Sequence, residues 1–322
     1  MVKSLELNKI KKDEFKDVGL VMVIGFFDGV HRGHQEIICS CIRKARETGG
    51  TSIALTFDWP PVNIIKKKIH KRLILSYEEK IEIIKAMNID LIVTAHIERS
   101  FLELDPEQFC ERILVGLFNI RELYIGKGFR FGKDAAGDIS FLKWYLRERP
   151  IKINEVALVK NNDEVISSTV IRKYYSKGDI KRIKQLLGRD PYLKGKVISG
   201  KGRGKKLGIP TVNIGASENL VMPKDGVYLG IVSEKEGLIE KMPAVINIGD
   251  NPTFKDKIKR VESHIIDYEG DLYKKIIKVE FLERLREEIK FESIEDLKVQ
   301  LEKDLRKARI YFGHRSDRPI RH

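Results

Sequence analysis

The first half of the chain alternates short apolar runs with segments whose apolar residues recur at helical spacing. Four apolar runs are predicted to be buried strands, at 20–24, 51–57, 91–95 and 122–126. The segments between them carry apolar residues every three to four positions, which predicts amphipathic helices. Strands that alternate with helices predict a doubly wound α/β fold, a parallel sheet with helices on both faces.

Two of these helices begin with capping signals. The sequence Ser76-Tyr-Glu-Glu79 is a capping box that predicts a helix reaching Met87. Asp105-Pro106 supplies an N-cap and a proline at the first helical position, and it predicts one helix through Phe118. Ligands of doubly wound sheets bind beyond the carboxyl ends of the strands. The loops that follow residues 24 and 126 are therefore expected to converge on one site.

The pattern changes after residue 188. Short apolar segments separated by Gly, Pro, Asn and Asp predict a small antiparallel β-barrel. Its expected strands are 197–198, 226–233, 244–248, 261–268 and 276–281. A C-terminal helix is expected after Ser293, with an apolar stripe formed by Ile294, Leu297, Leu301, Leu305 and Ala308.

The join between the two halves is expected to be helical. Residues 174–188 have helical character, with a stop and restart at Gly178-Asp179, and the segment 188–191 ends the helix. We therefore predict an α/β domain over residues 1–186 and a barrel domain over 187–312. Residues 313–322 are predicted to form a basic C-terminal tail.

Length and composition agree with two globular domains. The chain has 322 residues, 42% of them hydrophobic, and no apolar run of about 18 residues that would predict a membrane span. Residues 1–12 lack the apolar stretch of a signal peptide. Cys39, Cys41 and Cys110 form no CxxC pattern and are expected to be reduced packing residues. These features predict a cytoplasmic protein with no membrane partner, monomeric or weakly homo-oligomeric.

The formal net charge of +14 has three interpretations. It is compatible with nucleic-acid binding, with a lysine-rich surface, or with substrates that are polyanions such as ATP. The basic residues are scattered, apart from those at 66–68 and 201–206. No nucleic-acid-binding pattern interleaves aromatic residues with them, so we expect no nucleic-acid partner.

The stretch Gly25-Phe-Phe-Asp-Gly-Val-His-Arg-Gly-His34 joins a predicted strand to a predicted helix. Such a turn directs backbone N–H groups and the positive end of a helix dipole at one spot, which favours phosphate. A ligand can approach the backbone closely at three glycines, Gly25, Gly29 and Gly33. His31 and His34 can donate hydrogen bonds to a triphosphate, whereas Asp28 is equally compatible with stabilising the turn. The Walker pattern GxxxxGK[ST] is absent here.

Two further stretches in the first half have the character of binding loops. Residues 126–132, GKGFRFG, form either a glycine-rich turn with a packed phenylalanine or part of a ligand site. Ser167, Ser168 and Thr169 place hydroxyl groups at a predicted helix start. Arg172 adds forked donors suited to phosphate, although a capped helix with a surface arginine would have the same sequence.

A basic, glycine-rich stretch begins the second half. Residues 200–213 have the sequence GKGRGKKLGIPTVN, which is either a disordered basic hairpin or a loop that surrounds a triphosphate with backbone N–H groups. Thr211 and Asn213 are neutral oxygen ligands of the kind that phosphate-bound Mg²⁺ accepts. Glu262 and His264 share one face of a predicted strand. That pattern fits a half-exposed polar face, or a base for phosphoryl transfer.

Taken together, these stretches resemble a known family. The HRGH sequence at 31–34 is similar to the HxGH motif of nucleotidylyltransferases, and the ISSTVIR sequence at 166–172 follows it at the family's distance. The loop at 200–213, with Val212 in place of the usual Ala, is similar to the riboflavin kinase signature, as are residues 247–254 and 262–273. Over residues 20–312 the chain resembles the bacterial bifunctional riboflavin kinase/FMN adenylyltransferases (FAD synthetases).

The resemblance implies two reactions and assigns residues to them. The barrel domain would phosphorylate riboflavin to FMN with ATP and Mg²⁺, and the HxGH-type domain would adenylylate FMN to FAD and release pyrophosphate. Glu262 would be the base of the first reaction, and His31 and His34 would act in the second. Implied ATP or phosphate contacts are Gly25, Phe27, Asp28, Gly29, Gly33, Ser167, Ser168, Thr169, Arg172, Gly200, Arg203, Gly204 and Gly208. Implied flavin contacts are Phe129, Arg130, Phe131 and Asn247, and implied Mg²⁺ ligands are Thr211 and Asn213.

Three positions depart from the family pattern. Phe26 stands where the family usually has Asn, and Trp59-Pro60 interrupts the family's PHP sequence after the second strand. Gly128 replaces a common Asp. The last two departures keep open a kinase whose first half has lost transfer activity, so that flavin turnover stops at FMN. A nucleic-acid-binding protein is the other alternative, which a steep salt dependence of oligonucleotide binding would indicate.

Overall fold

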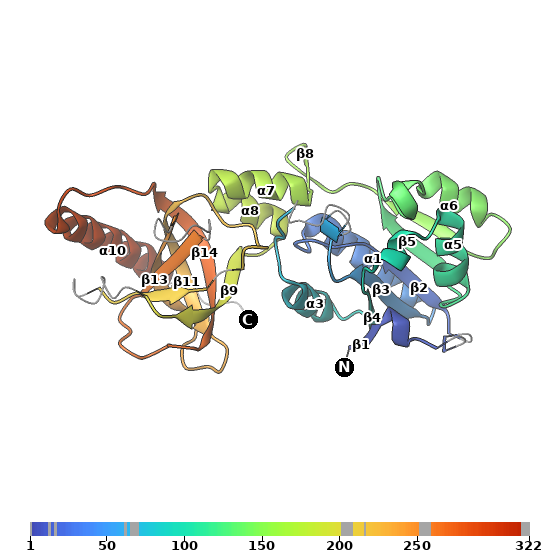
Figure 1. The fold of residues 1–322 in the computed structure, drawn as a ribbon, viewed down its shortest axis with the longest axis horizontal. Coiled ribbons are helices and arrows are strands. Elements are labelled where there is room, and N and C mark those ends of the chain that lie inside the picture. The colour runs from blue at the N-terminus through green and yellow to red at the C-terminus, as the bar shows by residue number, and fades with distance from the viewer. Residues whose placement is uncertain are drawn as a thin grey trace. The chain divides into compact units, whose positions relative to one another are not determined.

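The computed structural model describes residues 2–11, 14–15, 18–60, 63–64, 71–200, 209–215, 217–250 and 259–316. The chain divides into two compact units, residues 1–170 (unit 1) and 171–322 (unit 2). The elements of each unit are labelled in Figure 1.

Unit 1 is built on a six-stranded sheet in the order β1-β4-β3-β2-β5-β6, in which every neighbouring pair is parallel. The strands are β1 Lys3–Glu6, β2 Leu20–Ile24, β3 Thr51–Phe57, β4 Leu91–Ala95, β5 Glu122–Gly126 and β6 Lys152–Val156. The four predicted strands are confirmed. The two edge strands β1 and β6 were not predicted, because they are short and charged and lack the continuous apolar run of a strand buried on both faces.

Helices cover both faces of this sheet, so the doubly wound fold is confirmed. On one face Leu20, Met22 and Ile24 of β2 pack with Phe109 and Leu142 from the helices that follow β4 and β5. On the other face α1, Arg32–Glu47, packs against β2, β3 and β5. Among the described residues, further helices of unit 1 include α3 Tyr77–Ala86, α4 Arg99–Leu102, α5 Pro106–Phe109 and α6 Ile139–Tyr145. The expected capping box of Ser76 and Glu79 is present at α3.

The helix expected from Pro106 through Phe118 is formed as far as Val115, but only its first turn is α-helical. Helix α5 ends at Phe109 and continues as a π-helical segment, Cys110–Val115, in which the N–H of Gly116 donates to the carbonyl of Glu111 five residues earlier. Cys110 and Leu114 of this segment are completely buried in the core of unit 1. Apolar spacing alone does not distinguish this segment from an α-helix.

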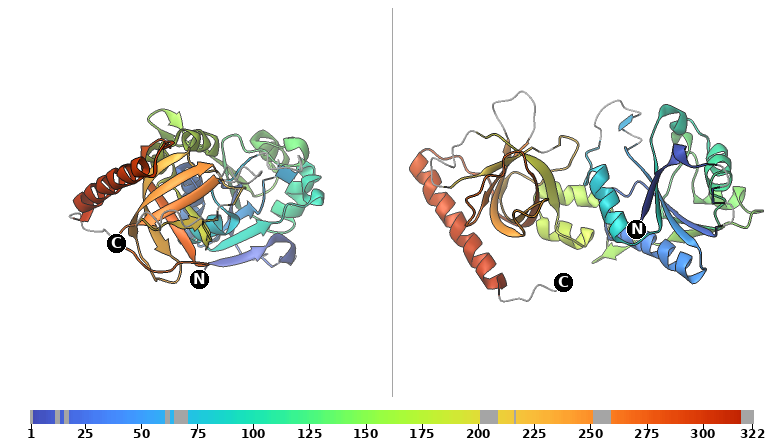
Figure 2. Two further views of the ribbon diagram at one scale, coloured as in Figure 1. Left: turned by 60° about the vertical axis from the view of Figure 1, so that its left-hand side comes forward. Right: turned by 90° about the horizontal axis from the view of Figure 1, so that it is seen from below.

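Unit 2 contains a closed barrel in the order β10-β13-β12-β11-β14-β9, with every pair antiparallel (Figure 2). Its strands are β9 Tyr192–Ile198, β10 Val212–Ile214, β11 Gly226–Glu234, β12 Met242–Asp250, β13 Lys259–Ile265 and β14 Ile276–Arg286. The predicted barrel is confirmed. The strand β10 was missed because it has three residues and lies inside the stretch interpreted as a loop.

Two helices connect the sheet to the barrel along the chain. Helix α7, Ser168–Lys177, is followed by α8, Ile180–Leu187, which packs against β14. The predicted stop between them is present, because Gly178 has a φ of +71° and the Asp179 side chain accepts a hydrogen bond from the N–H of Arg182 at 3.0 Å. The domain boundary at 186/187 stays a prediction, and the two compact units divide at 170/171.

Helix α10, Ile294–Ser316, lies along the outside of the barrel (Figures 1 and 2). Its N-cap is Ser293, whose Oγ accepts from the N–H of Asp296 at 3.0 Å. Leu305 and Ala308 pack against Val245 and neighbouring barrel residues, as the stripe predicts. Ile294 was predicted to belong to the buried apolar stripe, but this is wrong, because its side chain is 64% exposed at the start of the helix. The helix also includes residues 313–316, which were assigned to the tail.

A buried ion pair attaches α10 to the barrel and gives a stability prediction. Asp304 is completely buried and accepts from Nε and Nη2 of Arg286 at 2.9 and 2.7 Å. Asp304→Ala leaves the Arg286 charge unpaired and should lower the free energy of unfolding of unit 2 by about 3–5 kcal/mol. Denaturant unfolding followed by circular dichroism measures this loss.

Two controls accompany the Asp304 experiment. Glu287→Ala removes an exposed pair with Lys224 and should change the same transition by about 1 kcal/mol or less. Trp59 and Trp144 both lie in unit 1, so the tryptophan fluorescence transition should not move in either variant. Equal losses in the two variants would contradict the assignment of Asp304 as the buried anchor.

Candidate active sites

The loop between β2 and α1 has a constrained backbone. Phe27, Gly29 and Val30 have φ values of 53°, 80° and 37°, in the left-handed region that non-glycine residues rarely adopt. A Cβ at Gly25 would lie 2.7 Å from the Phe27 ring, so only glycine fits there. Strained non-glycine positions of this kind concentrate at functional sites, which makes the loop a candidate site on geometric grounds.

Contacts from distant segments hold this loop in place. The carboxylate of Asp28 is buried and accepts from the N–H of Ile74 at 2.9 Å. The hydroxyl of Ser168 donates to the carbonyl oxygen of Asp28, also at 2.9 Å. The Asp28 side chain is thus engaged with the backbone, which favours the turn-stabilising interpretation over direct phosphate contact. The start of α7 contacts the loop although 140 residues separate them in the sequence.

The two histidines of the loop stack on each other at the start of α1. Their ring centroids are 3.6 Å apart with an interplanar angle of 19°. His31 is the N-cap of α1, and its Nδ1 accepts from the N–H of His34 at 3.3 Å. The edge of the Phe27 ring contacts His34 with centroids 5.5 Å apart. The pair is therefore fixed at a helix N-terminus, where N–H groups favour anions.

The environment of His34 keeps its imidazole neutral. Burial lowers the pKa of His34 well below 6.5, and the nearby positive charges of His31 and Lys80 lower it further. A neutral imidazole has one N–H donor and one acceptor nitrogen. At neutral pH His34 can therefore donate one hydrogen bond to a phosphate oxygen without carrying a charge.

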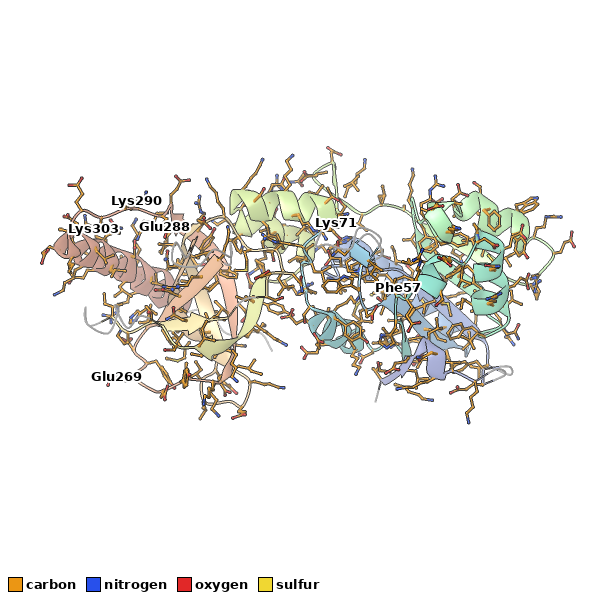
Figure 3. The ribbon with its side chains drawn as sticks, in the orientation of Figure 1. Phe57, Lys71, Glu269, Glu288, Lys290 and Lys303 are labelled. Atoms are coloured by element: carbon orange, nitrogen blue, oxygen red, sulfur yellow. The ribbon has the colours of Figure 1, made fainter. Side chains whose placement is uncertain are left out.

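The expected segments of unit 1 line one pocket of about 370 Å³. Its lining includes Gly25, Phe27, His31, Gly33, His34, Gly126, Gly128, Phe129, Ser167, Ser168 and Thr169. The predicted convergence of the loops after residues 24 and 126 is confirmed. Lys71, labelled in Figure 3, also lines the pocket, and no sequence pattern singled it out. Arg172 lies one turn beyond Ser168 on α7, and Trp59-Pro60 does not belong to the lining.

The FRFG stretch divides between the pocket and the core. Phe129 lines the pocket, stacked on Phe131 with centroids 5.7 Å apart. Phe131 itself is buried in the core against Phe109, so packing accounts for the position of its ring, and its flavin contact stays a prediction. Arg130 is exposed and pairs with Asp138 at 3.5 Å, away from the pocket lining. Gly128 has a φ of +80°, a conformation that disfavours the Asp common in the family.

Three residues expected at the kinase site lie side by side on three neighbouring strands of the barrel, a row that we call a rung. Asn213 on β10 pairs in register with Glu262 on β13, and Glu262 pairs in register with Asn247 on β12. Residues paired in register point to the same face of a sheet. Glu262 is half-buried, and its Oε1 accepts from Nη1 of Arg260 at 3.0 Å. The strand register thus assembles residues that are separated by up to 49 positions in the sequence.

A second pocket, of about 290 Å³, lies at the end of β10. Gly200, Thr211 and Asn213 line it with the turn at 268–273. A Cβ at Gly200 would lie 2.0 Å from Nδ2 of Asn213, so the glycine lets the chain close over this amide. Ser263 also lines the pocket, and its buried Oγ has no hydrogen-bond partner among the described residues. Nothing in the sequence pattern distinguished Ser263.

The oxygen ligands in this pocket are suited to a Mg²⁺ ion that is already bound to phosphate groups. The side chains of Thr211 and Asn213 supply neutral oxygens, and Asn213 is buried. The described residues contain no cluster of three or more His, Cys, Asp or Glu that could hold a metal by itself. His264 Nδ1 lies 2.7 Å from the carbonyl oxygen of Pro210, which anchors the chain next to Thr211. The expected contacts Arg203, Gly204 and Gly208 lie outside the described residues.

Comparison with known proteins identifies the family of the chain. A family model described as FAD synthetase matches residues 13–170, and one described as riboflavin kinase matches 187–312. A bifunctional riboflavin kinase/FMN adenylyltransferase of Bacillus subtilis is 33% identical over 309 residues, which cover 95% of each chain. The chain belongs to the bifunctional riboflavin kinase/FMN adenylyltransferase family. The resemblance inferred from the motifs is confirmed.

Other relatives of the family match the chain over nearly its whole length. The bifunctional riboflavin kinase/FMN adenylyltransferase of Listeria monocytogenes is 33% identical, covering 96% of this chain and 97% of the relative. A solved structure titled as a macrolide-efflux protein from Streptococcus pneumoniae has a TM-score of 0.83 and 27% identity, covering 96% of this chain and 99% of that one. Within the part of the chain that the structure describes, no helix is long and apolar enough to span a membrane.

Proposed function

We propose that this chain makes FAD from riboflavin in two ATP-dependent steps. Unit 2 phosphorylates riboflavin to FMN, and unit 1 transfers an adenylyl group from ATP to FMN. The observation that carries the proposal is the agreement of two family matches, in order along the chain, with two separate pockets lined by the matching motifs. The neutral cysteines Cys39, Cys41 and Cys110 agree with a reducing, cytoplasmic location.

In the adenylyl transfer, a phosphate oxygen of FMN attacks the α-phosphorus of ATP in line. The new phosphorus–oxygen bond forms as the bond to the pyrophosphate oxygen breaks, and pyrophosphate leaves with the electron pair. The protein contributes positioning and charge stabilisation. His31, His34 and the N-terminus of α1 would hold the phosphates, and Ser167 to Thr169 would approach them from the start of α7.

In the kinase step, the riboflavin 5′-hydroxyl oxygen attacks the γ-phosphorus of ATP. Glu262 would take the hydroxyl proton, and ADP leaves with the electrons of the broken phosphorus–oxygen bond. Asn247, next to Glu262 on the same rung, would orient the flavin. Thr211 and Asn213 would hold Mg²⁺, which neutralises phosphate charge when bound.

One incubation tests the whole proposal. Purified full-length protein is mixed with riboflavin, ATP and Mg²⁺, and the flavins are separated by chromatography. Successive appearance of FMN and FAD is the expected result. Accumulation of FMN alone would support the kinase alternative, with the Trp59-Pro60 and Gly128 departures as its cause. Unchanged riboflavin, together with unchanged FMN when FMN is supplied, would overturn the proposal and favour a role for the basic surface.

A further inference from the structure

A lysine is buried beneath the histidine-bearing loop of unit 1. Lys80 lies on α3 and is only 3% exposed. Its Nζ donates to the carbonyl oxygen of Phe26 at 3.1 Å and to that of Phe57 at 2.5 Å. The ammonium also lies 4.4 Å from the centroid of the Phe26 ring and 5.6 Å from that of Tyr77. Aromatic rings at such distances stabilise a cation.

The two carbonyl groups belong to the ends of neighbouring strands. Phe57, labelled in Figure 3, is the last residue of β3, and Phe26 lies two residues beyond the end of β2, within the loop that carries the two histidines. The Tyr77 hydroxyl, one turn before Lys80 on α3, lies 2.7 Å from Oγ1 of Thr94 on β4. The first turns of α3 are thus fixed to the carboxyl ends of three strands, and the ammonium is the contact that reaches the loop.

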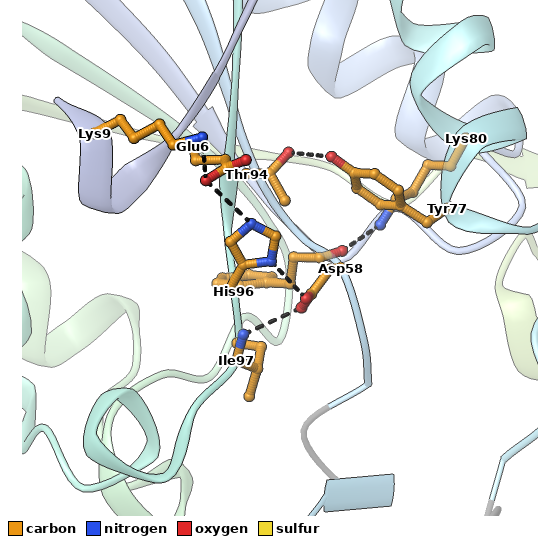
Figure 4. A network of polar contacts seen from close by, with 9 residues as sticks. Glu6, Lys9, Asp58, Tyr77, Lys80, Thr94, His96 and Ile97 are labelled. Carbon is orange, nitrogen blue, oxygen red and sulfur yellow. Dashed lines mark hydrogen bonds and ion pairs between the residues drawn. The ribbon is translucent and has the colours of Figure 1, made fainter.

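Charged groups surround this ammonium on several sides. Burial lowers the pKa of Lys80 from 10.5 to about 8, while the carboxylates of Asp28 and Asp58 oppose that shift. Asp58 is itself engaged with His96, whose Nδ1 lies 2.8 Å from Oδ2, and with the N–H of Ile97 (Figure 4). In the other direction, the charge of Lys80 lowers the pKa of His34. Lys80 is therefore charged at pH 7 and acts on the site.

Packing alone does not explain a charge at this position. A buried ammonium is costly unless it is hydrogen-bonded and paired, and an apolar residue of similar length would fill the same volume. The charge lies below a pocket whose expected ligands are polyanions. Phe26, where the family usually has Asn, offers this ammonium a ring as well as a carbonyl.

We infer that Lys80 is a positioning residue for adenylyl transfer. Its charged ammonium holds the Phe26 peptide, and through it the loop that carries His31 and His34, in the conformation that receives the phosphates. The same charge adds to the effect of burial, which is the main reason that the His34 imidazole stays neutral. This role rests on the proposed transfer of an adenylyl group in unit 1, and it adds a residue that makes no contact with the reacting atoms.

The first test replaces Lys80 with methionine in the full-length chain. Methionine matches the lysine side chain as far as Cε and removes the ammonium group, and with it the charge and both hydrogen bonds. We expect kcat/KM for adenylylation of FMN to fall about 100-fold, as for other misplaced catalytic groups, and riboflavin phosphorylation to be unchanged. Lys85→Met, in the last turn of the same helix, is the matched control and should leave both activities unchanged. Wild-type transfer in Lys80→Met would overturn the inference.

The pH dependence of adenylyl transfer shows whether Lys80 acts through its charge or through its packing. Transfer by the wild-type chain should decline above pH 8, where Lys80 loses its proton, and in Lys80→Arg this decline should move to higher pH because guanidinium stays protonated. Between pH 8 and 10.5 the unfolded chain binds more protons at this residue than the folded chain. The contribution of Lys80 to the free energy of unfolding therefore rises with pH, so unfolding does not explain the decline. If the transfer activities of the wild-type and Lys80→Arg proteins declined over the same alkaline pH range, the proposed role of the charge would be contradicted.

A titration of His34 gives a readout that needs no turnover. Proton NMR of the histidine rings, assigned with His34→Ala, should show the pKa of His34 rising in Lys80→Met relative to wild type. An unchanged pKa would overturn the electrostatic part of the inference. If the wild-type chain made no FAD, the proposed transfer would fail, whereas this titration would still decide whether Lys80 acts on His34.

Discussion

Replacing His34 with alanine is expected to abolish FAD formation and to leave FMN formation intact. The ring is stacked on His31 at the N-terminus of α1 and lines the pocket of unit 1, so its removal takes away the donor that we propose for the phosphates. Loss of one such donor lowers kcat by about 100- to 1000-fold. FAD formation from supplied FMN and ATP, and FMN formation from riboflavin, are measured on the same preparation.

A control on the same helix completes the His34 experiment. Glu36 is exposed on α1 and pairs with Arg43 at 2.9 Å, away from the pocket lining. Glu36→Ala should change neither rate. A His34→Ala protein that forms FAD at the wild-type rate would show that this histidine is not part of the transfer site.

Replacing Glu262 is expected to give the opposite result. Glu262→Ala should abolish phosphorylation of riboflavin while FAD is still made from supplied FMN. Glu262→Gln keeps the shape of the side chain and removes its basicity, so it should lower the kinase rate about 100-fold or more if the carboxylate acts as the base. Retention of kinase activity by Glu262→Gln would assign the residue a role in packing instead.

The barrel offers a closely matched control for Glu262. Glu280 on β14 pairs with Lys278, two residues before it on the same strand, as Glu262 pairs with Arg260. The two carboxylates are similarly exposed, 22% and 29%. Glu280→Gln should leave both reactions unchanged.

If His34→Ala or Glu262→Ala stopped both reactions in a protein that keeps its circular dichroism spectrum, the proposal of two separate active sites would be wrong.

The prediction of elements succeeded where burial leaves a strong pattern. Residues 20–24 and 91–95 are buried on both faces of a parallel sheet, and a continuous apolar run is the direct consequence. The edge strand β6 lies at the rim of the same sheet and mixes charged, polar and apolar residues without a regular period, so its sequence does not distinguish it from a loop. The π-helical turn at Cys110–Val115 has the apolar spacing of a helix, and only its hydrogen bonds reveal the wider geometry.

The residues of the two sites were predicted to different degrees. The loop residues His31 and His34 were identified because a strand, a glycine-rich turn and a helix start adjoin them in the sequence. Phe131 was assigned to the flavin because the FRFG loop resembles that of the family, and the structure adds that its ring packs in the core against Phe109. Lys71 and Ser263 line the pockets without any local signal. Local patterns indicate a loop, whereas the direction of each side chain depends on what packs around it.

The sequence by itself determined the fold class, the two-part organisation and the motifs that carry the chemistry, because periodicity and spacing are local properties. The tertiary structure alone decided which residues meet. Strand register places Glu262 between Asn213 and Asn247, and strand order places the ends of β2 and β3 side by side above Lys80. These are contacts between residues far apart in the chain. Hydrogen bonding between strands and burial select them, and no short stretch of sequence contains that information.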